Sequence, residues 1–286
     1  MVTVDSGAVT ARTDSLRAQI EQRIAAVPGA RVGVVLHDLG DRFDLRIGAD
    51  SSFHAASTMK VPVMIELFRR VDAGALSLGQ GVLVVNHFGS IVDGSPYSLD
   101  ANDDSDSSVY AMVGKRVSVG ELIEHMIIHS SNLATNTLIA LVGAAHADST
   151  AHALGATHMR VLRGVEDQKA YDLGMNNTTT ASDLAALMLA IERGQAASRS
   201  SCTKMRDILL REVYTGEIPA GLPSGTPVAQ KTGWITATLH DAAIVYPPGR
   251  TPYVLVVLTS GIPDEQVAGS LIADISRLVW GYTSAR

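Results

Sequence analysis

Ser57 and Lys60 stand three positions apart in the segment F-H-A-A-S-T-M-K-V-P-V-M, at the start of a strongly apolar run. Residues i and i+3 face the same side of a helix, so the lysine amine can reach the serine hydroxyl. A free serine is a weak nucleophile that needs a neighbouring base. An amine can act as that base only when its pKa is lowered, which burial and a second nearby cation both promote. The pair therefore predicts a serine nucleophile served by a lysine.

The same four-residue pattern occurs a second time, as Ser201 and Lys204. This second match lies in a polar, basic stretch that would not bury its lysine. We therefore expect Ser57 to be the nucleophile. Cys202 is the single cysteine of the sequence, which excludes an internal disulfide and thiolate metal clusters, and we expect it to be structural.

Ser130 and Asn132 lie in E-H-M-I-I-H-S-S-N-L-A-T-N, where one apolar helical segment stops and another starts. A loop at that point can direct a hydroxyl and a carboxamide into one cleft, although the same residue types also serve as plain helix caps. His125 and His129, four positions apart, could share a metal ion. The acidic residue of an H-E-x-x-H motif and a third ligand are both missing, so we expect packed or surface histidines and no metal.

The segment V-A-Q-K-T-G-W places Lys231, Thr232 and Gly233 at the end of an expected strand. A cation, a hydroxyl and a glycine that lets a ligand approach the backbone together make an edge suited to a carboxylate. A substrate can pair with such a strand by β-augmentation. Taken alone, the pattern is also typical of an ordinary strand end.

Strands are expected at both ends of the chain, with helices between them. Leu16, Ile20 and Ile24 recur at helical spacing behind the capping residues 13–15, and strand patterns on both sides of residues 39–40 predict a β-hairpin. Later strands are expected in P-V-A-Q-K-T-G, D-A-A-I-V-Y and P-Y-V-L-V-V-L-T. A closing helix is marked by Val267, Leu271, Ile275 and Leu278.

This pattern predicts an α+β fold, an α/β sandwich in which both chain ends build an antiparallel sheet covered by terminal helices. The α/β lobe would comprise residues 1–54 and 212–286, and an all-helical lobe, residues 55–211, would be inserted between them. Binding sites favour the seam between such lobes. All three motifs lie where the chain enters, crosses or leaves the helical lobe.

The hydrophobic content and net charge of the sequence exclude some classes of binding partner. The 286 residues are 46% hydrophobic and can bury a sizeable core, and the net charge of −6 argues against nucleic acid or an anionic membrane surface. Apolar runs are too short to cross a bilayer. The start M-V-T-V-D-S-G-A lacks the features of a signal peptide, so the compartment stays open: cytoplasmic as written, or periplasmic or secreted if a leader precedes it. We expect a monomer without a cofactor.

In this order, S-x-x-K, S-S-N and K-T-G resemble the motif set of class A β-lactamases and penicillin-binding proteins. The chain is similar to this penicillin-recognising serine hydrolase family from about residue 14 to its end, including V-D-A-G after the nucleophile segment and the helix start T-T-T-A-S-D-L. The resemblance implies the β-lactamase fold and a hydrolase that opens β-lactam antibiotics through an acyl-enzyme, an activity associated with antibiotic resistance.

The resemblance also implies catalytic roles. Ser57 would attack the lactam carbonyl, and Lys60 would help to remove its proton. Ser130, assisted by Lys231, would relay a proton to the departing lactam nitrogen. Class A members hydrolyse the acyl-enzyme with a glutamate on a loop before the T-T helix, and Glu166 is the candidate here.

Binding roles are implied in the same way. Asn132 would hold the side-chain amide of the substrate, and Lys231 with Thr232 would bind its carboxylate. The backbone N–H groups of Ser57 and Trp234 would form the oxyanion hole, in which one donor is worth about a hundredfold or more in rate.

The sequence departs from the family pattern at three side chains. The class A loop reads R-x-E-x-x-L-N, whereas Glu166 comes one residue later relative to Arg163, and Ala170 stands where a water-holding asparagine is expected. A solvated loop acid or a salt-bridge partner are the other interpretations of Glu166, and Asp167 is the reserve base. His240 stands where an arginine commonly assists carboxylate binding, and would be a weaker, pH-dependent partner.

Two departures lie near the S-S-N motif. Ser131 replaces the aspartate of S-D-N, which removes a charge that supports the loop but keeps both functional groups. An acidic segment at 98–108 lengthens the interval before Ser130, and it lacks the glycine and the terminal glutamate of a calcium loop. We expect a solvated loop at the rim of the cleft that alters substrate choice.

Two alternatives keep the same site. One is a D,D-peptidase or esterase that acts on a peptidoglycan-like peptide, with lactams as slow inhibitors. The other is a penicillin-binding sensor module that is acylated without turnover. The position of Glu166 relative to Ser57 discriminates between these and a lactamase.

Overall fold

The computed structural model describes residues 6–40 and 43–284, and its larger sheet is built from both ends of the chain. In spatial order the strands of this sheet are β2 (Asp44–Ile47), β1 (Arg31–Asp38), β11 (Tyr253–Ser260), β10 (Thr238–Val245) and β9 (Val228–Ile235). All neighbours in it are antiparallel, and β9 is an edge strand. The predicted α+β fold with an antiparallel sheet from both termini is confirmed.

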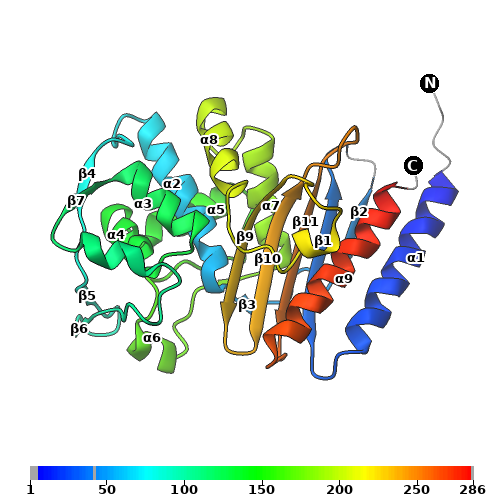
Figure 1. The fold of residues 1–286 in the computed structure, drawn as a ribbon, viewed down its shortest axis with the longest axis horizontal. Helices are drawn as coiled ribbons and strands as arrows, with labels where there is room; N and C mark the ends of the chain where they lie inside the picture. Colours follow the sequence, from blue (N-terminus) through cyan, green and yellow to red (C-terminus); the bar gives the residue numbers. More distant parts are fainter. Residues whose placement is uncertain (1–5, 41–42, 285–286) are drawn as a thin grey trace.

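The sheet is buried on both faces, which explains its nearly continuous apolar strands. Successive side chains of a strand point to opposite faces. Val34 and Leu36 accordingly pack on one side, against the terminal helices α1 (Ser6–Ala25) and α9 (Glu265–Ser284), whereas Val35 joins the core shared with the helical part. Figure 1 shows the resulting layers, with α1 and α9 on one side of the sheet and α2 to α8 on the opposite side.

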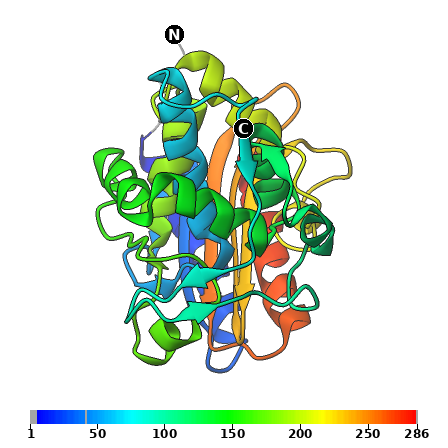
Figure 2. The ribbon, with the colours of Figure 1, turned by 90° about the vertical axis from the view of Figure 1, so that its left-hand side faces the viewer.

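The helical part lies between β3 and β9 along the chain, and Figure 2 shows it in front of the sheet. Its longer helices are α2 (Lys60–Asp72), α3 (Val119–Ile128), α4 (Asn132–Val142), α5 (Ala144–Ala153), α7 (Ala181–Glu192) and α8 (Arg199–Leu209). Shorter turns of helix are η1 (Ala56–Met59), η2 (Ser107–Met112), α6 (Gln168–Asp172) and η3 (Pro219–Gly221). Helix α7 packs directly on β1, β10 and β11 and so joins this part to the sheet.

Three two-stranded pairs complete the fold. They are β3 (Phe53–His54) with β8 (Thr178–Thr179), β4 (Gly81–Leu83) with β7 (Arg116–Ser118), and β5 (Phe88–Gly89) with β6 (Pro96–Tyr97). The first pair ties the segment that leads to Ser57 to the segment that follows Glu166. Two candidate residues far apart in sequence are thereby held on neighbouring segments.

The first helix departs from the sequence-based expectation. Its described part begins at Ser6, so the predicted cap at residues 13–15 is wrong, because α1 runs through those positions. Leu16 and Ile20 anchor the helix on the sheet, and the preceding alanine-containing turns extend it. The expected hairpin partner starting near residue 41 begins in the structure at Asp44, and residues 41–42 lie outside the described part. Among the described residues, every helix is too short or too polar to span a bilayer.

Candidate active site

Ser57 lies in η1, in the sharp turn between β3 and α2. The preceding residue, Ala56, adopts a φ of 46°, a left-handed conformation that is strained for a residue with a Cβ atom. Its amide donates to His54 Nδ1 at 3.0 Å, which stabilises the turn. Burial and the charge of Arg163 lower the pKa of His54 to about 4, so that its ring stays neutral and can accept this bond. The chain therefore holds Ser57 in a strained, fixed turn.

Gly233 is required by the close approach of this turn to β9. A Cβ atom at position 233 would lie 2.8 Å from the Ser57 nitrogen and 2.9 Å from the Thr58 nitrogen. The sequence predicts that this glycine makes room for a ligand, whereas in the structure it makes room for the nucleophile turn. The contact brings the Ser57 amide against the edge strand that carries the K-T-G motif.

The amide of Trp234 is suited to complete an oxyanion hole with the Ser57 amide. On the edge strand β9, the Thr232 amide points outward, since it donates to the side chain of Glu212. Backbone amides two residues apart on a strand point in the same direction. The Trp234 amide therefore also points outward, one residue beyond the glycine that contacts Ser57.

Lys60 is completely buried beneath the site. Its Nζ donates to the Ser130 carbonyl oxygen at 2.6 Å and to Asn132 Oδ1 at 2.9 Å, and lies 3.1 Å from Ser130 Oγ. Burial lowers the pKa of the Lys60 amine well below its usual value, and the positive charge of Lys231 acts in the same direction. Lys60 thus has the environment that the S-x-x-K motif predicts for a base.

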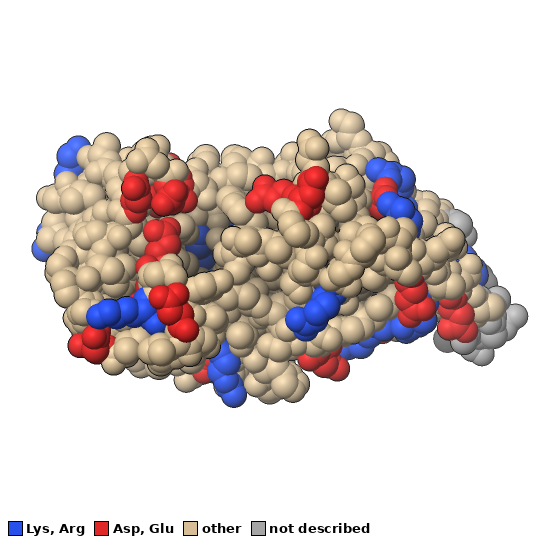
Figure 3. Space-filling view, turned by 90° about the horizontal axis from the view of Figure 1, so that it is seen from below, with Lys and Arg blue, Asp and Glu red and all other residues tan. Residues whose placement is uncertain are grey.

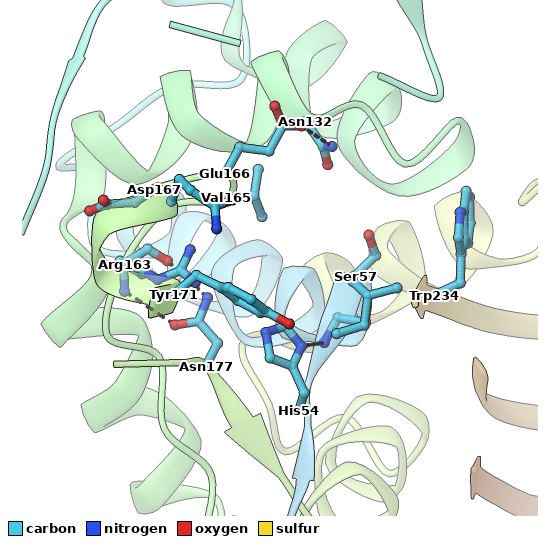
Figure 4. Close-up of a pocket in the computed structure, with 13 residues that line it drawn as sticks. His54, Ser57, Asn132, Arg163, Val165, Glu166, Asp167, Tyr171, Asn177 and Trp234 are labelled. Atoms are coloured by element: carbon cyan, nitrogen blue, oxygen red, sulfur yellow. Dashed lines mark hydrogen bonds between the residues drawn. The ribbon is translucent and has the colours of Figure 1, made fainter. Parts of the chain in front are cut away.

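Glu166 faces the same cavity as Ser57, a space of about 210 Å³. Its Oε1 accepts a hydrogen bond of 2.7 Å from Asn132 Nδ2, so that Asn132 links the Glu166 carboxylate to Lys60. Burial raises the pKa of Glu166 against the opposing effect of that hydrogen bond. Figure 4 shows Ser57, Asn132 and Glu166 around one opening, and Figure 3 shows the hollow between the helical part and the sheet, with acidic side chains along its helical side.

Asn136, one turn after Asn132 on α4, fixes the peptide before Glu166. Its side chain accepts from the Val165 amide at 2.7 Å and donates to the Val165 carbonyl at 3.0 Å. A Cβ atom at Gly164 would lie 2.4 Å from Asn136 Oδ1, so only glycine fits there. This contact is not among the sequence-based predictions, although the spacing of four positions between Asn132 and Asn136 could have indicated it.

Asp167 is not placed to serve as the reserve base. It caps the N-terminus of α6 by accepting from the Ala170 amide, and its carboxylate also accepts from Ser90 Oγ at 2.8 Å and the Ile91 amide at 2.9 Å. Figure 4 shows the carboxylate directed away from Ser57. The reserve assignment is therefore wrong. Ala170 itself is buried and offers no polar group to a water molecule.

The S-S-N turn depends on an aspartate that the sequence analysis did not connect with it. Ser130 has a φ of 58°, and Asn132 begins α4. The Asp104 carboxylate accepts from the amides of Asn132 and Leu133 at 2.9 Å each, and from Ser131 Oγ at 3.4 Å. Asp104 is nearly fully buried, which contradicts the prediction of a solvated acidic loop at this position. A carboxylate missing from the motif is therefore supplied by residue 104.

Lys231 and Thr232 are both engaged by a second residue that the sequence analysis missed, Glu212. The Lys231 amine pairs with the Glu212 carboxylate, and both side chains are fully buried. Thr232 Oγ1 donates to Glu212 Oε1 at 2.8 Å. Lys231 was expected to assist Ser130, but the lysine amine that contacts Ser130 Oγ in the structure is that of Lys60. Nothing in the sequence around Glu212, three residues after the end of α8, indicates that its side chain contacts the K-T-G motif.

His240 does not face the substrate edge, and its prediction as a carboxylate partner is contradicted. It is completely buried on β10; its Nε2 donates to the His54 carbonyl at 2.8 Å, and its Nδ1 accepts from the Thr259 amide at 3.2 Å. Burial lowers the pKa of His240 to about 4, so the ring is neutral near pH 7. A neutral ring with both nitrogens bonded to backbone groups cannot assist an anion.

The rival motifs have structural partners. His125 contacts Asp106 at 2.6 Å, and Ser201 Oγ donates to Asp72 at 2.6 Å at the start of α8. Cys202 is buried. Within residues 6–40 and 43–284, His, Cys, Asp and Glu side chains form no group suited to a metal ion.

A partly exposed serine three residues before a buried lysine, the outward amide of Trp234 next to the serine turn, and a carboxylate in the same cavity define a site built for acyl transfer to serine. The description "Beta-lactamase enzyme family" belongs to the family that matches residues 15–283, and the chain belongs to this family. The resemblance inferred from the motifs, and with it the class of serine β-lactamase-type hydrolases, is thereby confirmed.

Similar proteins span nearly the whole chain. Beta-lactamase AST-1 of Nocardia asteroides is 30% identical over 96% of this chain and 88% of its own length, and Beta-lactamase VEB-1 of Pseudomonas aeruginosa is 24% identical over 95% and 91%. Among solved structures, PBP-A aligns with a TM-score of 0.82 at 28% identity, covering 95% of this chain and 97% of PBP-A.

Proposed function

We propose that this protein hydrolyses β-lactams through an acyl-enzyme on Ser57. The observation that carries the proposal is the chain of contacts from Ser130 through the buried Lys60 to Asn132 and Glu166, the last two of which line the cavity that Ser57 faces. Family membership and relatives named as β-lactamases support the same activity.

In the acylation step, Ser57 Oγ bonds to the lactam carbonyl carbon and the C–N bond of the ring breaks. A neutral Lys60 amine has two N–H groups and one lone pair. The N–H groups serve the Ser130 carbonyl and Asn132, which leaves the lone pair to take the proton of the Ser57 hydroxyl. Ser130 Oγ, 3.1 Å from the Lys60 amine, then gives its own proton to the ring nitrogen and regains one from Lys60, while the amides of Ser57 and Trp234 hold the oxyanion.

In the deacylation step, Glu166 takes a proton from a water molecule that attacks the ester on Ser57. The bond from the acyl carbon to Ser57 Oγ then breaks, and the proton held by Glu166 returns to Ser57. A carboxylate whose pKa is raised by burial is a stronger base than an ordinary glutamate, and Asn132 fixes its orientation. Substrate enters as a small β-lactam, and since the residues that form this site lie on a single chain, we propose a monomer as the active unit.

A D,D-peptidase or esterase is the second candidate, supported by two observations. PBP-A is a near structural match, and a variant of it has been solved as an acyl-enzyme complex with penicillin G. Ala170 also provides no polar side chain where the class A loop has an asparagine, which would slow the water-dependent step.

Intact-protein mass spectrometry with benzylpenicillin distinguishes the candidates. A lactamase yields hydrolysed penicillin in many-fold excess over enzyme and a protein of unchanged mass. A peptidase or sensor yields a lasting adduct of one penicillin on Ser57. Ser57→Ala must abolish both outcomes; hydrolysis by that variant at a rate near that of the wild-type chain would show that the nucleophile is misassigned.

A further inference from the structure

Glu212 is a buried acid on the segment between α8 and η3, with no role in the acyl-transfer steps above. Its side chain is completely enclosed, and so is that of its partner Lys231. Leaving water costs a carboxylate several kcal/mol unless hydrogen bonds and an opposite charge compensate. The position therefore demands donors, and those it uses belong to the K-T-G motif.

The Glu212 carboxylate takes four contacts from two neighbouring residues. Oε1 pairs with the Lys231 amine and accepts from Thr232 Oγ1 at 2.8 Å, while the Thr232 amide lies 3.1 Å from Oε1 and 3.0 Å from Oε2. Lys231 and Thr232 are the two side chains expected to receive the carboxylate of a substrate. An internal carboxylate thus already uses the donors that an external one would need.

The surroundings disfavour a second carboxylate at this place. Asp241 is fully buried nearby, and burial raises its pKa well above the ordinary value, with the negative charges of Glu212 and Glu217 adding to the effect. Asp241 Oδ1 and Glu217 Oε2 are buried without a hydrogen-bond partner. Three acids therefore gather near Lys231, whose positive charge also acts on Lys60. An additional carboxylate at this place would have to be accommodated among these three acids.

We propose that Glu212 is an internal competitor at the carboxylate subsite, so that this protein gains little from a free carboxylate on its lactam substrate. The inference rests on the proposed function and concerns its substrate class. A substrate that carries an ester or amide at that position loses nothing, because it has no charge to place against Lys231. A carboxylate-bearing substrate must first displace Glu212 from Lys231 and Thr232.

The test compares benzylpenicillin with its methyl ester, in a Ser57→Ala background where neither is consumed. Dissociation constants are measured by calorimetry. With Glu212 present, we expect the acid to bind no more than about threefold tighter than the ester. Glu212→Gln, which removes the charge, and Glu212→Ala, which also vacates the space, should each tighten the acid at least tenfold, because the donors of Lys231 and Thr232 become accessible to its carboxylate. Both variants should leave the affinity for the ester within threefold.

Glu217→Gln is the matched control, because it removes an acid from the same cluster without releasing Lys231 or Thr232. It should change the affinity of the acid by less than threefold. Unchanged binding of the ester shows that each variant keeps its site. The inference is wrong if the acid binds the Glu212 variants no tighter than the parent, or binds no variant measurably. A protein that binds this way but neither hydrolyses penicillin nor is acylated through Ser57 would refute only the proposed function.

Discussion

Asp104 supports the S-S-N turn from outside the motif, and its removal should be costly. Asp104→Ala leaves the amides of Asn132 and Leu133 without the carboxylate that accepts from them. A buried, unsatisfied polar group costs about 1–3 kcal/mol, so we expect a loss of about 2–4 kcal/mol in unfolding free energy. For a chain of this size that loss lowers the melting temperature by about 3–7 °C. Thermal unfolding followed by circular dichroism measures it.

Changing Ser131 to aspartate tests whether a carboxylate at position 131 can take over the role of the Asp104 carboxylate. Ser131 Oγ lies 3.4 Å from Asp104 Oδ2 and already caps α4. In the Asp104→Ala background, Ser131→Asp restores an acceptor and should recover about 1 kcal/mol or more. In the wild-type background the same change sets two carboxylates side by side, which should destabilise the protein by about 1 kcal/mol or more.

The reasoning therefore predicts opposite signs for one substitution in two backgrounds, a coupling that a double-mutant cycle measures directly. Activity should follow, because Asn132 links Lys60 to Glu166: Asp104→Ala should slow acylation by about a hundredfold, and Ser131→Asp should restore part of it. If Ser131→Asp shifts stability in the same direction in both backgrounds, Asp104 does not substitute for the aspartate of the motif.

Three further outcomes follow from the geometry. Glu166→Gln should allow acylation but stall release, so mass spectrometry should find a lasting adduct on Ser57, and rapid turnover by the variant would exclude Glu166 as the base. In the wild-type chain, the rate of acyl-enzyme hydrolysis should fall as the pH drops through the pKa of Glu166, which burial raises above the ordinary value near 4.3. Gly233→Ala should displace the Ser57 turn and cut the acylation rate at least tenfold, and an unchanged rate would contradict the close packing. The native pKa of His240 is about 4 against about 6.5 unfolded, so unfolded chains bind its proton first and stability should fall by up to about 3 kcal/mol as pH drops from 6.5 to 4. Denaturant titrations should find the share of His240 absent in His240→Gln, whereas the share of His54, whose pKa is also lowered to about 4, should remain. The KM of this variant for a carboxylated lactam should stay unchanged, and a raised KM would return His240 to the substrate edge.

The residues that carry chemistry could be identified from the sequence because each has a distinctive type at a fixed local spacing. Ser57 and Lys60 belong to one turn of helix, and Ser130 and Asn132 flank one helix start, so local geometry alone sets how their side chains project. The strands at both chain ends followed in the same way from their apolar patterns and turns.

Side-chain direction and long-range partners required the tertiary structure. Successive residues of a strand face opposite sides of the sheet, so an alignment of His240 with an arginine position does not establish which way its ring points. Its burial against the His54 carbonyl is a property of the packed β3 and β10 segments.

Asp104 and Glu212 show the same limit at greater sequence distance. The first lies 28 residues from the amide it supports, and the second 19 residues from its lysine partner. A short polar motif determines which donors a turn presents, but any carboxylate that the fold brings near can occupy them. The nucleophile and its base were therefore determined locally by the sequence. Which acids surround them was decided by packing, because charge pairing acts through space and not along the chain.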